Sequence, residues 1–211
     1  TEADNDYLFG HSNSATAYAY MIQHEVDHGI DPSVHYADLT AAAQNALRIN
    51  GQDLLTHGAL IQGSILLAIY HLDSGRDLDG PIQAARQHIE KFIQLQPGIP
   101  IVYNHLAITH QLIAQRTLRQ GDDPSAAIQS GLRALVDGAR RSGGGDGVAV
   151  SLEAQLLALQ AQAQQGRNQS PQLSLDLALV RSQQAVQRSP EDPEVLLAAA
   201  EATWRAGAVR M

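Results

Sequence analysis

The sequence predicts an all-α fold, an α-solenoid of stacked antiparallel helical hairpins with about four pairs and one final helix. Three observations predict it. The 211 residues are 44% hydrophobic but only 4% aromatic, and the abundant Ala, Leu, Gln and Arg are good helix formers. Residues that end one helix and start another recur at a fixed spacing. Between these points, apolar residues follow a three- and four-residue periodicity typical of amphipathic helices.

The recurring element is a tight turn between two helices. It occurs as Gly29-Ile-Asp-Pro32, Gly75-Arg-Asp-Leu78, Gly121-Asp-Asp-Pro124 and, more weakly, Gly166-Arg-Asn-Gln169. The glycines at 29, 75, 121 and 166 are 46, 46 and 45 residues apart. Glycine suits the left-handed position after a helix, Asp or Asn caps the next helix, and Pro fits its first turn.

A second kind of turn lies midway between these glycines. It occurs as Asn50-Gly-Gln-Asp53, Gln96-Pro-Gly-Ile-Pro100, the glycine run at 143–145 and Ser189-Pro-Glu-Asp-Pro193. Two turns in each period of about 46 residues imply two helices in each repeat. The glycine-rich stretch Arg140–Val148 is expected to be a flexible loop.

The helices follow from these turns and from the apolar stripes between them. Stepping back by 46 from Ile128, Gly131 and Leu135 reaches Ile82, Ala85 and Ile89, so one face recurs in the same register. The expected helices are Ser12–His28, Pro32–Asn50, Asp53–Ser74, Gly80–Gln96, Ile99–Gln120, Pro124–Ser142, Gly147–Gln165, Pro171–Ser189 and Glu191–Ala206. They form one repeat domain over 1–211, with repeats at about 12–50, 53–96, 99–142 and 147–189 and a final helix at 191–207.

Composition excludes several functional classes. A net charge of −8, with Lys91 as the only lysine, argues against nucleic-acid binding. The absence of cysteine excludes disulfides and thiolate metal sites. The longest apolar run, Ile65–Tyr70, is far shorter than the roughly 20 residues that span a bilayer, so no membrane insertion is expected. The sequence does not fix the compartment, and a cytoplasmic location is favoured. The start at Thr1 lacks the features of a signal peptide and indicates a segment of a longer protein or a processed product.

Several phrases resemble the tetratricopeptide repeat. The endings of the second helices, Asn45-Ala-Leu-Arg-Ile-Asn50, Glu90-Lys-Phe-Ile-Gln-Leu-Gln-Pro97 and Gln184-Ala-Val-Gln-Arg-Ser-Pro190, resemble that family's A-L-x-L-x-P. Tyr103-Asn-His-Leu-Ala107 followed by Gly121, and Ala198-Ala-Ala-Glu-Ala202 followed by Gly207, are similar to its first helix. The repeat departs from the family in length, since the family period is about 34 residues.

The resemblance implies a right-handed superhelix that binds a protein or peptide in its concave groove, with no catalysis and no cofactor. The long repeat with its Gly-x-Asp-Pro join, as in Leu118-Arg-Gln-Gly-Asp-Asp-Pro124, resembles repeat regions C-terminal to bacterial serine/threonine kinase domains. That narrower resemblance implies a regulatory or substrate-docking role in signalling. A purely architectural, self-associating array is the other non-catalytic expectation.

The groove is expected along the first helix of each hairpin. The 46-residue register places four residues of one first helix beside four of the next. They are Gly58, Gln62, Ile65 and Leu66 in one, and Asn104, Ile108, Gln111 and Leu112 in the other. Their amides would bond a ligand backbone while their aliphatic side chains bury its side chains, or else some would pack against the adjacent repeat. A partner with an acidic tail is disfavoured, because one lysine cannot supply the family's basic clamp.

A catalytic alternative comes from Gln23-His-Glu-Val-Asp-His28. It contains the H-E-x-x-H pattern of zinc hydrolases, in which His24 and His28 would ligate the metal and Glu25 would activate water. The flanks resemble peptide deformylase, but that family's cysteine ligand and glycine-rich substrate segment are missing. A third ligand would have to be His11 or His35, and exposed polar helix residues are the competing interpretation.

Trp204 is alone on the final expected helix. It is interpreted as a core or junction residue. Exposure at that position would instead indicate that a neighbouring repeat is missing.

Overall fold

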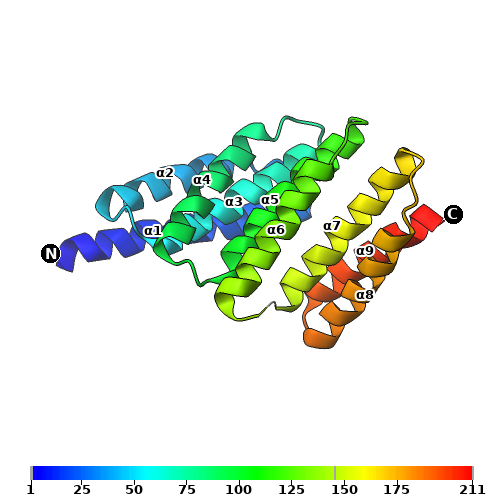
Figure 1. The fold of residues 1–211 in the computed structure, drawn as a ribbon. Coiled ribbons are helices and arrows are strands. Elements are labelled where there is room, and N and C mark those ends of the chain that lie inside the picture. The colour runs from blue at the N-terminus through cyan, green and yellow to red at the C-terminus, as the bar shows by residue number, and fades with distance from the viewer. Residues whose placement is uncertain (1, 145, 211) are drawn as a thin grey trace. The chain divides into compact units, whose positions relative to one another are not determined.

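A computed structural model of the chain describes residues 2–144 and 146–210, with side chains over 7–144 and 146–208. Nine helices and no strand occur in that part of the chain. The helices are α1 Glu2–Asp27, α2 Ser33–Ile49, α3 Leu54–Asp73, α4 Asp79–Leu95, α5 Pro100–Arg119, α6 Ser125–Ser142, α7 Gly147–Gly166, α8 Gln172–Arg188 and α9 Pro193–Arg210 (Figure 1). The all-α prediction is therefore confirmed.

The helices group into two compact units, Thr1–Pro97 and Gly98–Met211. The first holds α1 to α4 and the second holds α5 to α9. The expectation of a single domain over 1–211 stays a prediction. Each unit is built from hairpins of consecutive helices, as the two turns in each repeat indicate.

In the first unit α1 packs on α2, α3 packs on α4, and α3 also contacts both helices of the preceding hairpin. The turns after α1 and α3 contain Gly29 and Gly75, whose φ angles of 68° and 71° lie in the left-handed region. Glycine adopts this conformation without steric cost. The left-handed turn lets backbone N–H groups bond the last carbonyls of the helix. The prediction that these glycines end helices is confirmed.

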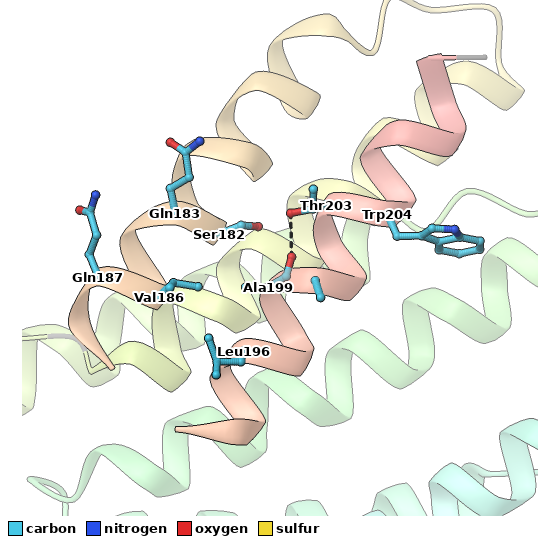
Figure 2. Close-up of a pocket in the computed structure, with 9 residues that line it drawn as sticks. Ser182, Gln183, Val186, Gln187, Leu196, Ala199, Thr203 and Trp204 are labelled. Carbon is cyan, nitrogen blue, oxygen red and sulfur yellow. Dashed lines mark hydrogen bonds between the residues drawn. The ribbon is translucent and has the colours of Figure 1, made fainter. Parts of the chain in front are cut away.

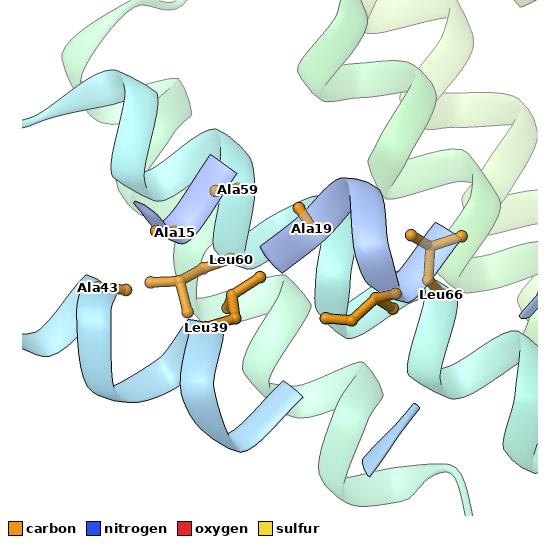
Figure 3. Close-up of a cluster of buried hydrophobic side chains, with 8 residues drawn as sticks. Ala15, Ala19, Leu39, Ala43, Ala59, Leu60 and Leu66 are labelled. Carbon is orange, nitrogen blue, oxygen red and sulfur yellow. The ribbon is translucent and has the colours of Figure 1, made fainter. Parts of the chain in front are cut away.

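The core of the first unit lies where α1, α2 and α3 meet. Its buried side chains come from all three helices: Ala15, Ala19, Ile22, Leu39, Ala43, Ala59, Leu60 and Leu66 (Figure 3). Gly63 of α3 faces this cluster, and a Cβ atom there would lie 2.8 Å from Cδ1 of Leu39. A small residue at position 63 therefore lets α2 and α3 approach closely.

A buried polar group joins α1 to the start of α3. The Asp53 carboxylate accepts hydrogen bonds from Ser12 Oγ at 2.7 Å, Thr56 Oγ1 at 2.5 Å and the Thr56 backbone nitrogen at 3.1 Å. Burial alone would raise the pKa of Asp53, but the bonds from Thr56 and Ser12 hold this pKa below its ordinary value. Asp53 thus caps α3 and fixes α1 beside it.

In the second unit α5 packs on α6 and α7 packs on α8, while α9 contacts both α7 and α8. The core around α5, α6 and α7 includes Ala107, Ile128, Leu135 and Leu156. Gly138 of α6 permits a close contact, since a Cβ there would lie 2.7 Å from Cβ of Tyr103. Three first helices, α5, α7 and α9, thus pack in succession within this unit.

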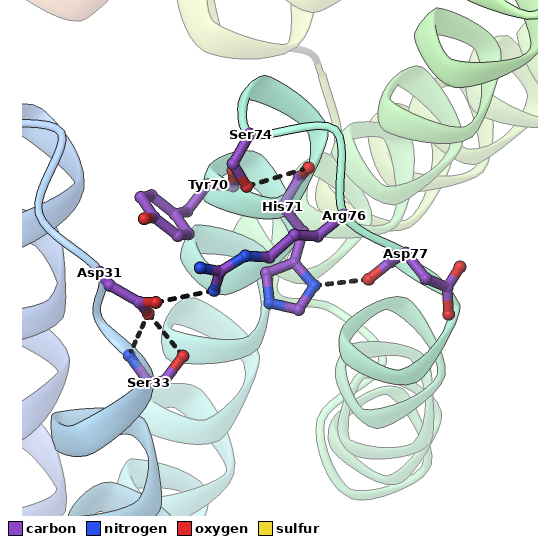
Figure 4. A network of polar contacts seen from close by, with 7 residues as sticks. All are labelled: Asp31, Ser33, Tyr70, His71, Ser74, Arg76 and Asp77. Carbon is purple, nitrogen blue, oxygen red and sulfur yellow. Dashed lines mark hydrogen bonds and ion pairs between the residues drawn. The ribbon is translucent and has the colours of Figure 1, made fainter.

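The turns of neighbouring hairpins are joined by an ion pair in each unit. In the first unit Arg76 Nη1 donates to Asp31 Oδ2 at 2.7 Å (Figure 4). In the second unit Arg167 pairs with Asp123. Both aspartates also accept a hydrogen bond from the backbone nitrogen two residues later, which starts the next helix.

Two predicted boundaries are wrong. The first helix begins at Glu2 rather than Ser12, because the segment before Ser12 contains no proline and a single glycine such as Gly10 does not stop a helix. Arg140–Ser142 belong to α6, so the expected loop is shorter than Arg140–Val148. The remaining predicted ends lie within four residues of the observed ones.

Within the described residues α3 alone is long and apolar enough to cross a membrane by length and composition. Core helices of soluble proteins pass the same test, and 61% of this stretch is buried within the chain.

Candidate functional site: the groove between α8 and α9

The H-E-x-x-H segment lies at the end of α1. The rings of His24 and His28 stack with centroids 4.2 Å apart, and His28 Nδ1 bonds the backbone oxygen of His24 at 2.7 Å. Glu25 points to α2, where its Oε1 lies 2.6 Å from His35 Nδ1. Glu25 and His35 therefore bond each other.

A metal centre at this segment would need a third donor near His24 and His28. Among the described residues, no group of three or more His, Cys, Asp or Glu side chains is arranged to hold an ion. His35, one of the two expected third ligands, bonds Glu25. His11 lies earlier on α1, with its ring 6.2 Å from that of Tyr7. The geometry thus gives the zinc-hydrolase alternative no support.

The predicted groove residues of α3 lie in the first unit. Ile65 and Leu66 are each only 5% exposed, and Leu66 belongs to the core cluster of that unit. Gly58 and Gln62 are half-buried. Ile65 and Leu66 therefore lack free surface, which matches the packing interpretation for these two positions.

The predicted groove residues of α5 lie in the second unit. Asn104, Gln111 and Leu112 are buried, while Ile108 is half-buried and packs against the core cluster. Gln111 Nε2 donates to Gln155 Oε1 of α7 at 3.2 Å. The buried Asn104 Nδ2 has no hydrogen-bond partner within the described part of the chain. The Gln111 amide thus bonds the next first helix, and the Asn104 amide nitrogen is left unsatisfied.

An apolar opening in the second unit lies elsewhere, between α8 and α9. It has a volume of about 700 Å³ and is formed by one face of each helix (Figure 2). Its lining consists of Ser182, Gln183, Val186, Gln187, Leu196, Ala199, Ala200, Thr203 and Trp204. Among these described residues none carries a charge, and we refer to this surface as the α8–α9 groove.

Local sequence positions the two helices that form the groove. Asp192 caps α9, since its Oδ1 accepts the backbone nitrogen of Glu194 at 2.9 Å, and Pro193 occupies the first helical position. Ala199, Ala202 and Ala206 are buried on the inner face of α9. These small side chains allow α9 to lie close to α7 and α8.

The outer face of α9 is apolar but open to solvent. Trp204 is 71% exposed and Leu197 is 72% exposed. In Figure 2 Val186 of α8 and Leu196 of α9 lie on the two sides of the groove, and the Trp204 ring projects from α9 away from α8. Trp204 is therefore not a core residue. The expectation of a core position for Trp204 is thus wrong, and the expectation that exposure here marks a missing repeat stays a prediction.

The chemistry that the groove offers is burial of apolar surface. Its lining contains no charged or titratable side chain among the described residues, while hydroxyl and amide groups lie at Ser182, Gln183 and Thr203. Thr203 Oγ1 bonds the Ala199 oxygen of its own helix at 2.8 Å. Such a surface suits an aliphatic segment of another chain better than an ion or a small charged molecule.

Sequence reasoning singled out Trp204 only as a core or junction residue and did not find this groove. The available signal was the repeat register: positions on α9 that match buried positions on earlier first helices hold large apolar side chains. Comparison of the chain with known protein families, with curated proteins and with solved structures finds no match.

Proposed function

We propose that this protein is a non-enzymatic, helical-repeat binding module whose α8–α9 groove takes up an apolar segment of a partner protein. The observation that carries the proposal is an uncharged groove of about 700 Å³ whose rim bears a tryptophan that is 71% exposed. Exposed tryptophans and aliphatic patches of this kind mark protein-binding surfaces. The tetratricopeptide resemblance, with its concave groove, and the kinase-linked docking role stay predictions.

The energetics favour occupation of the groove. Burying a large apolar side chain contributes roughly 1.5 to 3 kcal/mol, and Leu196, Leu197 and Trp204 all keep much of their surface in water. A partner that covers these side chains gains this energy without the cost of desolvating a charge. The groove is held between packed helices, so little ordering of the protein opposes binding.

The proposal is tested by selecting short random peptides from a displayed library on the immobilised protein. We expect selection of peptides rich in aliphatic residues, whose binding is lost in Leu196→Glu. The matched control is Leu173→Glu, which places the same charge at another exposed leucine, on α8 outside the groove lining. Circular dichroism verifies that both variants remain folded.

Failure to select any peptide, or equal binding of selected peptides to both variants, would contradict the proposal. The same experiment also distinguishes the bound form of the ligand. Aliphatic residues spaced by three and four positions indicate a bound helix, whereas alternation indicates an extended strand.

A further inference from the structure

The second unit contains another groove, and its lining residues occupy the same repeat positions as those of the α8–α9 groove. The helix-capping residues Pro124 and Pro171 begin α6 and α8 and lie 47 residues apart. Asp146 caps α7 and Asp192 caps α9, 46 residues later. Residues of α6 and α7 can therefore be matched one by one with residues of α8 and α9.

The earlier groove lies between α6 and α7, and it is lined by equivalent positions. Leu135, Val136 and Ala139 of α6 match Ser182, Gln183 and Val186 of α8, and Val150, Glu153 and Leu157 of α7 match Leu196, Ala199 and Thr203 of α9. All six pairs consist of residues that line the two grooves. The two surfaces are thus the same structural element in successive repeats.

The earlier groove is covered by a helix. α8 contributes Leu177, Arg181 and Arg188 to its lining, and Arg181 Nε donates to Glu153 Oε1 at 2.9 Å. Ala178 of α8 belongs to one buried cluster with Leu157 and Ala158 of α7. The second helix of the hairpin therefore covers the α7 side of this groove.

Without such a helix the equivalent positions on α9 are exposed. Ala158 is completely buried, whereas its counterpart Trp204 is 71% exposed. Ser151 is 2% exposed, whereas its counterpart Leu197 is 72% exposed. The outer face of α9 thus has large apolar side chains where the chain elsewhere buries the matching positions.

We infer that the occupant of the α8–α9 groove is an amphipathic α-helix of a partner protein, which docks in the place of a second hairpin helix and runs antiparallel to α9. This inference rests on the proposed function and names its ligand. Ala199 of α9 occupies the repeat position that Glu153 occupies in α7. The α8–α9 groove therefore has no counterpart of the carboxylate that Arg181 bonds in the earlier groove. The docking face of the partner helix is therefore uncharged and aliphatic, with small residues at the central contact as at Ala178.

A second copy of this chain has no suitable helix available within its described part. The second helices α2, α4, α6 and α8 each pack against the first helix of their own hairpin. Donation of one of them would require a hairpin to open. A separate partner helix avoids that cost.

The probe is a synthetic peptide of residues 171–189, the chain's own groove-covering sequence, with Arg181→Leu to match the missing acid. It contains no tryptophan, so fluorescence of Trp204, the only tryptophan of the chain, reports binding directly. We expect a saturable blue shift of the Trp204 emission. Since an isolated helix of this length is marginal in water, we also expect a gain in helical circular dichroism on binding.

Variants locate the binding site through anisotropy of a labelled peptide. Leu196→Glu and Trp204→Ala should each weaken binding by about tenfold or more, while Leu173→Glu should leave it unchanged. A peptide that also carries Ala178→Glu should fail to bind, because a charge then faces the uncharged groove.

Each other outcome overturns the inference. No binding of this peptide, while selected extended peptides still bind in a manner that depends on Leu196, would refute the helix and leave the proposed function intact. No binding of any peptide would refute both. A concentration-dependent dimer that shields Trp204 without peptide would make a second copy the occupant, and shielding of Trp204 within a longer form of the same polypeptide would make it an internal helix.

Discussion

Arg76 and Asp31 form a hydrogen-bonded ion pair of 2.7 Å between two successive interhelical turns of the first unit. The Asp31 carboxylate also accepts bonds from the side chain and the backbone nitrogen of Ser33. The Arg76 guanidinium lies 5.2 Å from the centroid of the Tyr70 ring. A turn that starts one helix is therefore fixed to the turn of the next hairpin.

The pKa of Asp31 should respond to each of these partners. Hydrogen bonding from Ser33 first, and from Arg76 second, lowers this pKa from 3.8 to about 2. We expect Arg76→Gln to raise the pKa of Asp31 only part of the way towards 3.8, and Ser33→Ala to raise it further. Carboxyl chemical shifts followed by NMR during acid titration measure both values. A larger effect of Arg76→Gln than of Ser33→Ala would contradict this order of causes.

Stability should rise with pH between about 4 and 6.5. Burial lowers the pKa of His105 to about 4, and burial together with the neighbouring His57 lowers the pKa of His88 to about 4. In this range the unfolded chain binds more protons than the folded chain, so the free energy of unfolding falls as the pH drops from 6.5 through 4. For His105 the loss is roughly 1 to 3 kcal/mol.

Urea denaturation at several pH values measures this dependence. We expect a shallower slope between pH 4 and 6.5 in His105→Gln and the shallowest slope when His88→Gln is added. An unchanged slope in the double variant would show that these histidines do not cause the acid sensitivity.

Two glycines should respond in opposite ways to an added methyl group. Gly138→Ala places a Cβ 2.7 Å from Cβ of Tyr103, close to the backbone of α5, so we expect destabilisation by about 1 to 3 kcal/mol. Gly58→Ala meets no atom within 4 Å and should stabilise α3 by about 0.5 to 1 kcal/mol. Thermal unfolding followed by circular dichroism compares the two, and equal shifts of Tm would refute the packing argument at Gly138.

The two aspartate caps should differ in their importance. Asp146 caps α7 through the Ala149 nitrogen at 2.7 Å and is exposed, so Asp146→Ala should cost about 1 kcal/mol. Asp53→Ala should cost about 2 to 4 kcal/mol, since it also removes the acceptor of the buried Ser12 hydroxyl and the shorter of the two bonds of the Thr56 hydroxyl. Chemical denaturation gives both values, and a smaller effect at Asp53 would show that its links to α1 contribute little.

The order of the helices could be predicted from the sequence because turn chemistry is local. Gly29 and Gly75 mark helix ends by their left-handed conformation, and Ile82, Ala85 and Ile89 mark a buried face by their spacing. The start of α1 could not be found in this way, because a weak helix former such as Gly10 is tolerated when its neighbours continue the helix.

The exposed groove was harder to predict, because exposure depends on which helix is absent. Leu196 and Leu197 have the apolar character of core residues on a first helix, and only the tertiary arrangement shows that no described helix covers them. Conversely, Asn104 and Gln111 are polar and suggest a surface, yet both are buried. Residue type alone therefore does not separate exposed from buried positions on these helices.

The ion pairs between turns make successive hairpins depend on each other. Arginine follows the turn glycine at Arg76 and Arg167 but not after Gly29 or Gly121, and each arginine bonds the aspartate of the preceding turn, Asp31 or Asp123. Each ion pair therefore belongs to two successive hairpins together, so removal of either hairpin would leave the turn of the other without this charged partner.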